Sequence, residues 1–277
     1  MGESPKEPME RESGQEIRQE LGEMLESADG SWSLYVQSFD QEEAAFEYGR
    51  DKVFYAASIN KLPIALYTLS QVEEGEINLN DELEVTEEVK CPGTGILRLL
   101  REGLHVTVED ALTLMMAVSD NTAAKLMVRK AGPENINEYL EASGFGNTWL
   151  EVLPEGNFSY GYTTAKESAQ LLRGIHNAEY VSPEASQKLL AVLGRNHFSY
   201  GVRRYLPKDL KIANKEGSLE DNRHEVAAVM TERPYTAGVF ADDLADRSYH
   251  VDNAGVLQRA RIAEKVHALM QENGENR

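Results

Sequence analysis

The chain has 277 residues, of which 41% are hydrophobic, so it is long enough to bury a large core. Its 47 acidic residues outnumber its 28 basic residues and give a formal net charge of -19, which argues against nucleic acid or an anionic membrane as a partner. The single cysteine, Cys91, excludes an intrachain disulfide, and no neighbouring histidine marks it as a reactive thiol.

Residues 1–15 are acidic and contain proline, and we expect them to be disordered. They show neither the basic end nor the apolar run of a secretory signal. No apolar run in the chain approaches the roughly 18 residues of a membrane span. We therefore expect a cytoplasmic protein as the sequence is written, or a secreted or periplasmic one if a leader has been removed.

The predicted elements change in kind along the chain. Apolar residues at helical spacing predict a helix over 16–28, and alternation of period two then predicts a hairpin of two strands over 32–48. Helical spacing returns from 58 to about 72, where Pro63 is tolerated because the N–H groups of a helix's first turn have no helical partners. Further helices are predicted at 107–130, with a break near 119–121, and at 133–142, 164–175 and 182–193.

The last part of the chain returns to strand patterning, at 211–217, 224–232 and 235–243, and ends in a helix over 255–272. We predict an α+β fold in which both ends of the chain build one five-stranded antiparallel sheet flanked by the terminal helices. Residues 16–53 and 195–277 then form a discontinuous sheet domain. Residues 54–194 form an all-helical second lobe.

The stretch FYAASINKLPIALY, residues 54–67, places Ser58 and Lys61 three positions apart at the start of an apolar helix. Residues i and i+3 share a helix face, so the amine can reach the hydroxyl. A serine needs a base within hydrogen-bond reach to become a good nucleophile, and a lysine can be that base if burial or a nearby cation lowers its pKa. The alternative is an N-cap serine beside an exposed lysine.

Two further segments supply matching groups. In VSDNTAAKLM, residues 118–127, Ser119 offers a second hydroxyl and Asn121 an amide. In KEGS, residues 215–218, a lysine precedes a glycine that lets a ligand approach the strand backbone. A hydroxyl between two lysines can pass a proton to a leaving group. The glycine-bearing stretch 91–100 is not a phosphate cradle, because it lacks a third glycine and a preceding strand.

The motifs SINK at 58–61, SDN at 119–121 and KEG at 215–217 resemble, in order and separation, those of the serine β-lactamase and penicillin-binding protein superfamily. The sequence is most similar to the class A β-lactamases, which usually have K-T-G or K-S-G in place of KEG. The resemblance runs from about residue 30 to the C-terminus. It implies a β-lactamase or transpeptidase-like fold and a serine hydrolase that opens β-lactam amides.

The resemblance also implies a catalytic role for each matching side chain. Ser58 would be the acylated nucleophile, and Lys61 would accept its proton during acylation. Ser119 would pass the proton to the lactam nitrogen, with electrostatic help from Lys215.

The same resemblance implies the substrate-binding groups. Asn121 would hold the amide side chain of the substrate. The backbone N–H groups of Ser58 and Ser218, the latter following Gly217, would form the oxyanion hole. Arg223 would bind the substrate carboxylate, and a strand-edge charge is an equal alternative for it.

Two positions depart from the family. The E-x-x-L-N stretch, whose glutamate activates the water that releases the acyl group, is absent from WLEVLPEGNFSYGYTTAKES, residues 149–168. Glu151, or Glu155 with Asn157 nearby, is the candidate base, and a solvated loop charge is the alternative for each. The second departure is Glu216, which replaces a hydroxyl that commonly helps to bind a carboxylate. It would repel an anionic ligand if it pointed into the site, but strand alternation leaves its direction open.

Without a placed base, acylation would outpace deacylation. Two alternatives to a β-lactamase therefore stay open: a penicillin-binding, DD-peptidase-like or esterase enzyme with slow deacylation, and a β-lactam-binding sensor that does not turn over. The expected partner is a small molecule, a β-lactam or related amide, and we expect a monomer. No cofactor and no metal is expected, because the histidines form neither H-x-H nor H-E-x-x-H and there is no Walker or dinucleotide motif.

Overall fold

The two ends of the chain build one antiparallel sheet. The computed structural model describes residues 13–154, 157–198 and 200–272, and in them five strands pair in the order β2-β1-β10-β9-β8. Strand β1 pairs with β10 along its whole length, so the first strand lies beside the last. The predicted five-stranded antiparallel sheet is confirmed. Its strands are β1 (Ser31–Ser38), β2 (Ala44–Tyr48), β8 (Lys211–Ser218), β9 (Arg223–Met230) and β10 (Tyr235–Asp242).

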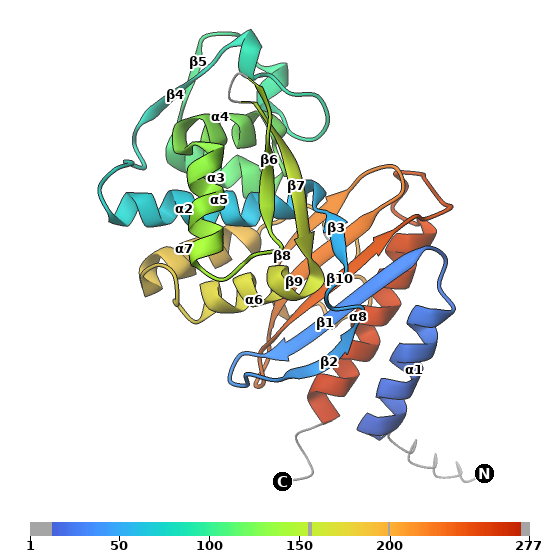
Figure 1. Ribbon diagram of the computed structural model, residues 1–277. Coiled ribbons are helices and arrows are strands. Elements are labelled where there is room, and N and C mark those ends of the chain that lie inside the picture. Colours follow the sequence, from blue (N-terminus) through green and yellow to red (C-terminus); the bar gives the residue numbers. More distant parts are fainter. Residues whose placement is uncertain (1–12, 155–156, 199, 273–277) are drawn as a thin grey trace, which may run out of the picture.

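Helices α1 (Gly14–Glu26) and α8 (Ala254–Glu272) lie side by side over one face of this sheet (Figure 1). Their apolar side chains pack on those of the strands, and the shared core includes Leu21, Leu34 and Leu269. Burial of apolar side chains between helices and a sheet is the main source of stability for such a layer. The terminal helices therefore flank the sheet as the sequence predicts.

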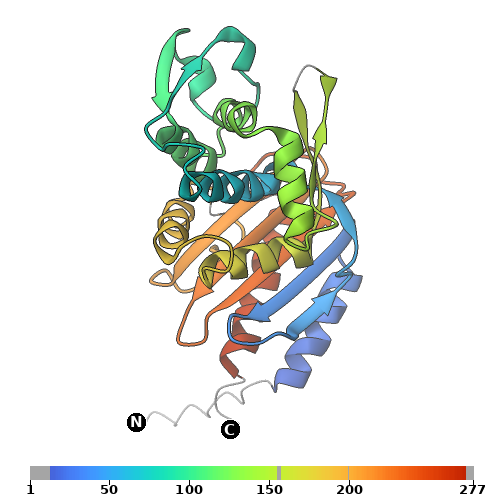
Figure 2. The ribbon, with the colours of Figure 1, turned by 60° about the vertical axis from the view of Figure 1, so that its left-hand side comes forward.

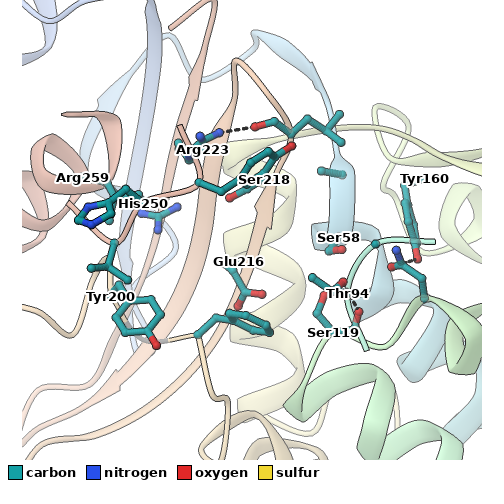
Figure 3. A pocket seen from close by; sticks show the side chains of 18 of the residues that line it. Ser58, Thr94, Ser119, Tyr160, Tyr200, Glu216, Ser218, Arg223, His250 and Arg259 are labelled. Carbon is teal, nitrogen blue, oxygen red and sulfur yellow. Dashed lines mark hydrogen bonds between the residues drawn. The ribbon is translucent and has the colours of Figure 1, made fainter. Parts of the chain in front are cut away.

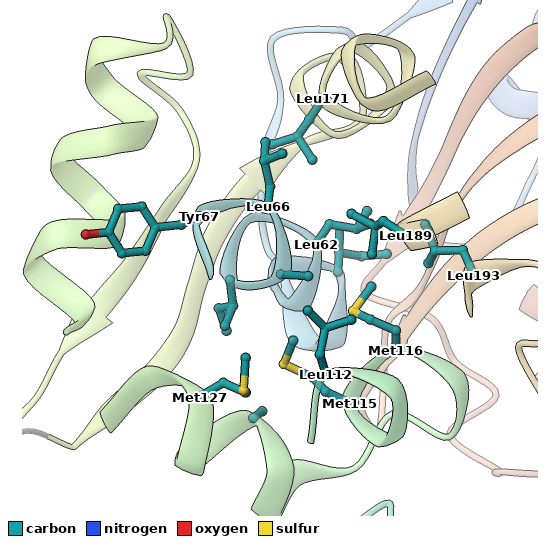
Figure 4. Close-up of a cluster of buried hydrophobic side chains, with 14 of the residues drawn as sticks. Leu62, Leu66, Tyr67, Leu112, Met115, Met116, Met127, Leu171, Leu189 and Leu193 are labelled. Atoms are coloured by element: carbon teal, nitrogen blue, oxygen red, sulfur yellow. The ribbon is translucent and has the colours of Figure 1, made fainter. Parts of the chain in front are cut away.

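Helix α6 packs on the opposite face, against β1, β9 and β10, and α7 packs on that side against β8. Helices α2 to α5 lie on the same side of the sheet (Figure 2). A second core surrounds α2, most of whose residues are buried because it is apolar on every side. Figure 4 shows Leu62 and Leu66 of α2 with Met115, Met127 and Leu171 from neighbouring helices. The helices of this region are α2 (Lys61–Glu73), α3 (Val108–Ala117), α4 (Asn121–Ala131), α5 (Pro133–Ala142), α6 (Ala165–His176) and α7 (Pro183–Leu193).

The region 54–194 is not wholly helical, which corrects the sequence-based expectation. Short strands form a three-stranded sheet, β3-β7-β6, and a two-stranded sheet, β4-β5. Four of these strands have only three or four residues, too few for alternation to stand out. The aromatic residues of β7 do alternate, but the β6-β7 hairpin lies where the sequence reading placed a loop. They are β3 (Val53–Tyr55), β4 (Glu82–Val85), β5 (Leu104–Thr107), β6 (Trp149–Val152) and β7 (Phe158–Thr164).

Helix α1 begins earlier than the apolar spacing predicts. Ser13 Oγ accepts the Glu16 N–H at 3.3 Å, and the Ser13 N–H donates to Glu16 Oε2 at 2.7 Å, which forms a capping box. The expectation of disorder is therefore wrong for residues 13–15, and residues 1–12 lie outside the described residues. The predicted domain boundaries stay a prediction.

Within the ranges that the structure describes, no helix combines the length and the apolar composition that crossing a bilayer requires.

We expect Gly238→Ala to destabilise the protein by about 1–3 kcal/mol, because a Cβ at Gly238 would overlap the carbonyl oxygen of Ala165 where α6 meets β10. Gly22→Ala is the matched control, since a Cβ at Gly22 on α1 meets no atom within 4 Å. That variant should be stabilised by about 0.5–1 kcal/mol, because alanine favours helix over glycine. Urea unfolding of both variants measures the difference, and equal effects would contradict the close packing.

Candidate active site

A cavity of about 570 Å³ opens where the sheet meets the helical region, within the usual size range of small-molecule sites. Its walls include Ser58, Ser119, Asn121, Glu216 and Ser218 (Figure 3). Three segments that are far apart in the sequence meet there: the turn before α2, the junction of α3 and α4, and strand β8. The three motifs of the sequence therefore share one cavity.

The turn that carries Ser58 is a short 3-10 helix, Ala57–Asn60, and α2 itself begins at Lys61. The predicted helix from residue 58 is therefore split into two pieces. Ala57 has a φ of 46°, in the left-handed region that few residues other than glycine adopt. This geometry turns Ser58 towards the cavity, with Lys61 Nζ 3.0 Å from Ser58 Oγ.

Lys61 is fully buried, so the exposed-lysine alternative is excluded. Its Nζ lies 2.6 Å from Ser119 O, 2.7 Å from Asn121 Oδ1 and 3.1 Å from Ser119 Oγ. The carbonyl and amide oxygens can only accept, so a neutral amine donates its two protons to them and keeps its lone pair for a hydroxyl. Burial lowers the pKa of Lys61 well below its usual value, and the charge of Lys215 lowers that pKa further. The amine is thus suited to take a proton from Ser58.

Ser119 lies between two lysines. Its Oγ is 3.1 Å from Lys61 Nζ and 3.1 Å from Lys215 Nζ. Lys215 is also fully buried, and burial lowers its pKa. Ser119 has a φ of 54°, another left-handed residue held in place by its surroundings. A proton taken up at Lys61 therefore has a short path to the Ser119 hydroxyl.

Asp120 ties the Ser119 turn to the loop before it. One carboxylate oxygen accepts the Ala123 N–H and caps α4, while the other accepts the N–H groups of Ile96 and Leu97 at 2.6 and 2.9 Å. Gly95 has a φ of 105°, and a Cβ there would overlap Asp120, so this position requires glycine. The loop that the sequence reading rejected as a phosphate cradle is in fact part of the cavity wall.

Strand β8 contacts the turn that carries Ser58 at Gly217. A Cβ on Gly217 would lie 2.9 Å from Ala56 O and 3.0 Å from Ser58 N, which is closer than side chains tolerate. The glycine therefore lets the strand backbone reach the turn that carries Ser58. Ser58 and Ser218 both line the cavity beside this contact, which suits a pair of backbone oxyanion donors.

Arg223 also lines the cavity, but its guanidinium is directed at the main chain. It donates to the carbonyl oxygens of Leu219, Asn222 and Ser248, and its charged end lies 5.3 Å from the centre of the Tyr249 ring. Burial lowers the pKa of Arg223. These contacts favour a strand-edge charge over a ligand for the substrate carboxylate. Arg223 holds the start of β9 to the neighbouring loops.

The combination of fold and motifs is shared with a known group of enzymes. The family model described as the β-lactamase enzyme family matches residues 16–270, which is most of the chain. This chain belongs to the β-lactamase enzyme family. It is a β-lactamase-like serine hydrolase, and its substrate is a small molecule.

The individual relatives have low sequence identity to this chain. The β-lactamase VEB-1 of Pseudomonas aeruginosa is 26% identical over 199 residues, 68% of this chain and 67% of that protein. The β-lactamase regulatory protein BlaB of Streptomyces cacaoi is 33% identical over 90 residues, which span 32% of this chain and 29% of that protein. The crystal structure of a β-lactamase from Sphaerobacter thermophilus superposes with a TM-score of 0.81 at 24% identity, covering 92% of this chain and 97% of that chain. That likeness shows the shared fold.

In this β-lactamase family member, Glu216 is the one carboxylate among the described residues that line the cavity. Glu151 is exposed on β6 and is not part of that lining. Glu155 lies outside the described residues. Asn157 bonds within its own turn, where its amide donates to Pro154 O. The structure thus brings the acylation groups together without placing Glu151 beside them.

The sequence analysis missed two residues of this site, Tyr160 and Asn60. The Tyr160 hydroxyl donates to Asn121 Oδ1 at 3.0 Å, and its ring centre lies 5.0 Å from Lys61 Nζ. Burial raises the pKa of Tyr160 well above its usual value, so it is a neutral phenol. Asn60 Nδ2 donates to Trp149 O and Tyr160 O, at 3.1 and 2.6 Å, and holds the β6-β7 hairpin against the cavity. The alternating aromatic residues of that hairpin are the sequence signal for a strand there.

In the described parts of the chain, no three His, Cys, Asp or Glu side chains come close enough together to hold a metal ion.

His224, next to Arg223 on β9, is a buried histidine whose two ring nitrogens both have hydrogen-bond partners. Its Nδ1 accepts the Ala241 N–H at 3.3 Å, and its Nε2 lies 3.1 Å from Tyr55 O, to which it donates. Burial lowers the pKa of His224 to about 3, so it is neutral near neutral pH.

We expect His224 to make the protein acid-sensitive. The unfolded chain takes up a proton near the ordinary histidine pKa of 6.5, whereas the folded chain does so only near 3. Between these values the unfolded state binds more protons, so stability is lost as pH falls, by up to about 1.4 kcal/mol per pH unit. Urea unfolding at pH 7 and pH 5 should show a smaller acid loss for His224→Asn than for wild type. The exposed His105→Asn should follow the wild type, and parallel curves for all three proteins would contradict the assignment.

Proposed function

We propose that this protein opens β-lactam amides through an acyl-enzyme on Ser58, and that release of the acyl group is the slow step. The observation that carries the proposal is the chain of contacts from Ser58 Oγ to Lys61 Nζ, to Ser119 Oγ and to Lys215 Nζ, with separations of 3.0, 3.1 and 3.1 Å. Each separation is within hydrogen-bond reach, so a proton can follow the chain.

In the acylation step, Ser58 Oγ attacks the lactam carbonyl carbon while its proton passes to the Lys61 amine. The carbonyl oxygen becomes an anion, held by the N–H groups of Ser58 and Ser218. Loss of one such donor typically costs about 3 kcal/mol of transition-state stabilisation. The C–N bond then breaks, and the lactam nitrogen takes a proton from Ser119, which is replenished from Lys61. The Lys215 charge beside Ser119 favours this donation.

Release of the acyl group requires a base that activates water. Glu216, the carboxylate of the described cavity wall, already accepts from Lys215 Nζ and Asn196 Nδ2, at 3.1 and 2.7 Å. Tyr160 is a neutral phenol and cannot act as that base. Among the described residues, several groups suit acylation, whereas Glu216 is the one carboxylate of the cavity wall and is already held by two hydrogen bonds. This contrast supports an acyl-enzyme that accumulates before it is hydrolysed.

We expect protein treated with a penicillin to gain the mass of one penicillin molecule and to keep it well after free β-lactam is removed, as measured by intact-mass spectrometry. Ser58→Ala should gain no mass, because the attacking hydroxyl is gone. Ser70→Ala is the matched control, since Ser70 is a buried serine on α2 that does not line the cavity and whose hydroxyl donates to the Tyr67 carbonyl. An adduct on Ser58→Ala, or loss of the wild-type adduct within the mixing time, would refute the proposal.

We expect the acylation rate to rise with pH as Lys61 loses its proton. An ammonium cannot accept a proton, so acylation fails below the pKa of Lys61 and is complete above it. Because burial lowers that pKa, the midpoint should lie well below the ordinary value of 10.5. Lys61→Gln should slow adduct formation by about 10²–10⁴-fold, whereas Lys188→Gln, on an exposed part of α7, should leave it unchanged. A pH-independent rate would argue against Lys61 as the base.

A further inference from the structure

Glu216 faces the cavity, which answers the question that strand alternation left open. Its side chain lines the cavity wall and keeps 13% of its surface exposed. Figure 3 shows it projecting between Ser119 on one side and Tyr200 on the other. A carboxylate therefore stands on the wall next to the proposed proton donor.

Both oxygens of this carboxylate are held in place. Oε1 lies 3.1 Å from Lys215 Nζ, and Oε2 accepts from Asn196 Nδ2 at 2.7 Å. Asn196 is fixed in turn, because it also donates to Asn214 O and accepts the Phe198 N–H. The carboxylate cannot swing out of the cavity without breaking these bonds. Its charge also offsets that of Lys215, so the pair presents no net positive charge to a ligand.

The two arginines on the described wall do not compensate for this charge. Arg223 donates to main-chain carbonyl oxygens, as shown above. Arg259 Nε lies 3.0 Å from the buried Glu225 carboxylate, and the same side chain donates to His224 O at 2.9 Å. A carboxylate on a ligand would have to displace these partners to gain a guanidinium contact.

The leaving-group side of an acyl donor must lie close to Glu216. Ser119, which gives its proton to the leaving nitrogen, is 3.1 Å from Lys215 Nζ, and Glu216 Oε1 is 3.1 Å from that same nitrogen. Substituents on the leaving nitrogen therefore pass the Glu216 carboxylate. A negative charge on such a substituent would then lie near the carboxylate of Glu216, and like charges repel each other where water is scarce.

We propose that Glu216 sets the substrate class of this site: it selects acyl donors that carry no negative charge on the leaving-group side, such as neutral amides or esters. This inference rests on the proposed acylation of Ser58. Glu216 is a specificity-determining residue and takes no part in bond making. Its hydrogen bonds remain intact with an uncharged ligand, whereas an anionic ligand must approach against its charge.

A competition experiment tests the selection directly. The full-length protein is mixed with equal concentrations of a penicillin and its methyl ester, each in excess, and the early adducts are resolved by intact mass, since they differ by one methylene group. We expect the ester adduct to exceed the free-acid adduct by about tenfold in the wild type. Because both adducts form on the same protein, their ratio does not depend on the fraction that is folded.

The charge-neutral variant Glu216→Gln should bring the two adducts to about equal amounts or favour the free acid. Glu220→Gln is the matched control, because Glu220 is an exposed carboxylate nearby whose side chain does not line the cavity, and it should keep the wild-type ratio. A wild-type preference for the free acid, or a ratio unchanged in Glu216→Gln, would overturn the selection while leaving acylation intact. Absence of both adducts from the wild type would overturn the acylation proposal and the inference with it.

Discussion

The buried amine of Lys61 is the group on which the site depends. A lysine removed from water is strongly destabilising unless oxygen atoms surround it. Here those oxygens come from Ser58 on one side and from Ser119 and Asn121 on the other. The need to satisfy one nitrogen therefore fixes the turn before α2 against the junction of α3 and α4. The same burial lowers the pKa of Lys61, which favours the neutral amine that can accept a proton.

Different parts of the cavity wall around this amine carry different kinds of side chain. Rigid elements carry Ser58, Ser119 and Lys215, so the geometry of the proposed acyl transfer is largely preorganised. The β6-β7 hairpin adds Tyr160 to the cavity wall, where its neutral ring and hydroxyl lie beside Lys61 and Asn121. The protein thus combines the fold of the β-lactamase family with a hairpin that presents a neutral phenol to the cavity.

The sequence predicts those parts of the site that depend on local spacing. Ser58 and Lys61 face each other because residues three apart share one side of a helical turn. The direction of Glu216 is not local: it is decided by the pairing of β8 with β9, where Glu216 lies opposite Glu225. The short β6-β7 hairpin also escaped prediction, because a few alternating residues resemble an irregular loop. The partners of Arg223 come from distant loops, so its orientation required the folded chain.

The amide of Asn60 joins the β6-β7 hairpin to the turn that carries Ser58 through main-chain carbonyls. Such contacts are indifferent to the identity of the side chains on the hairpin. A hairpin side chain such as Tyr160 can therefore be exchanged while the backbone contacts of Asn60 stay in place. One asparagine side chain thus holds the position of the hairpin, whichever side chains the hairpin presents to the cavity.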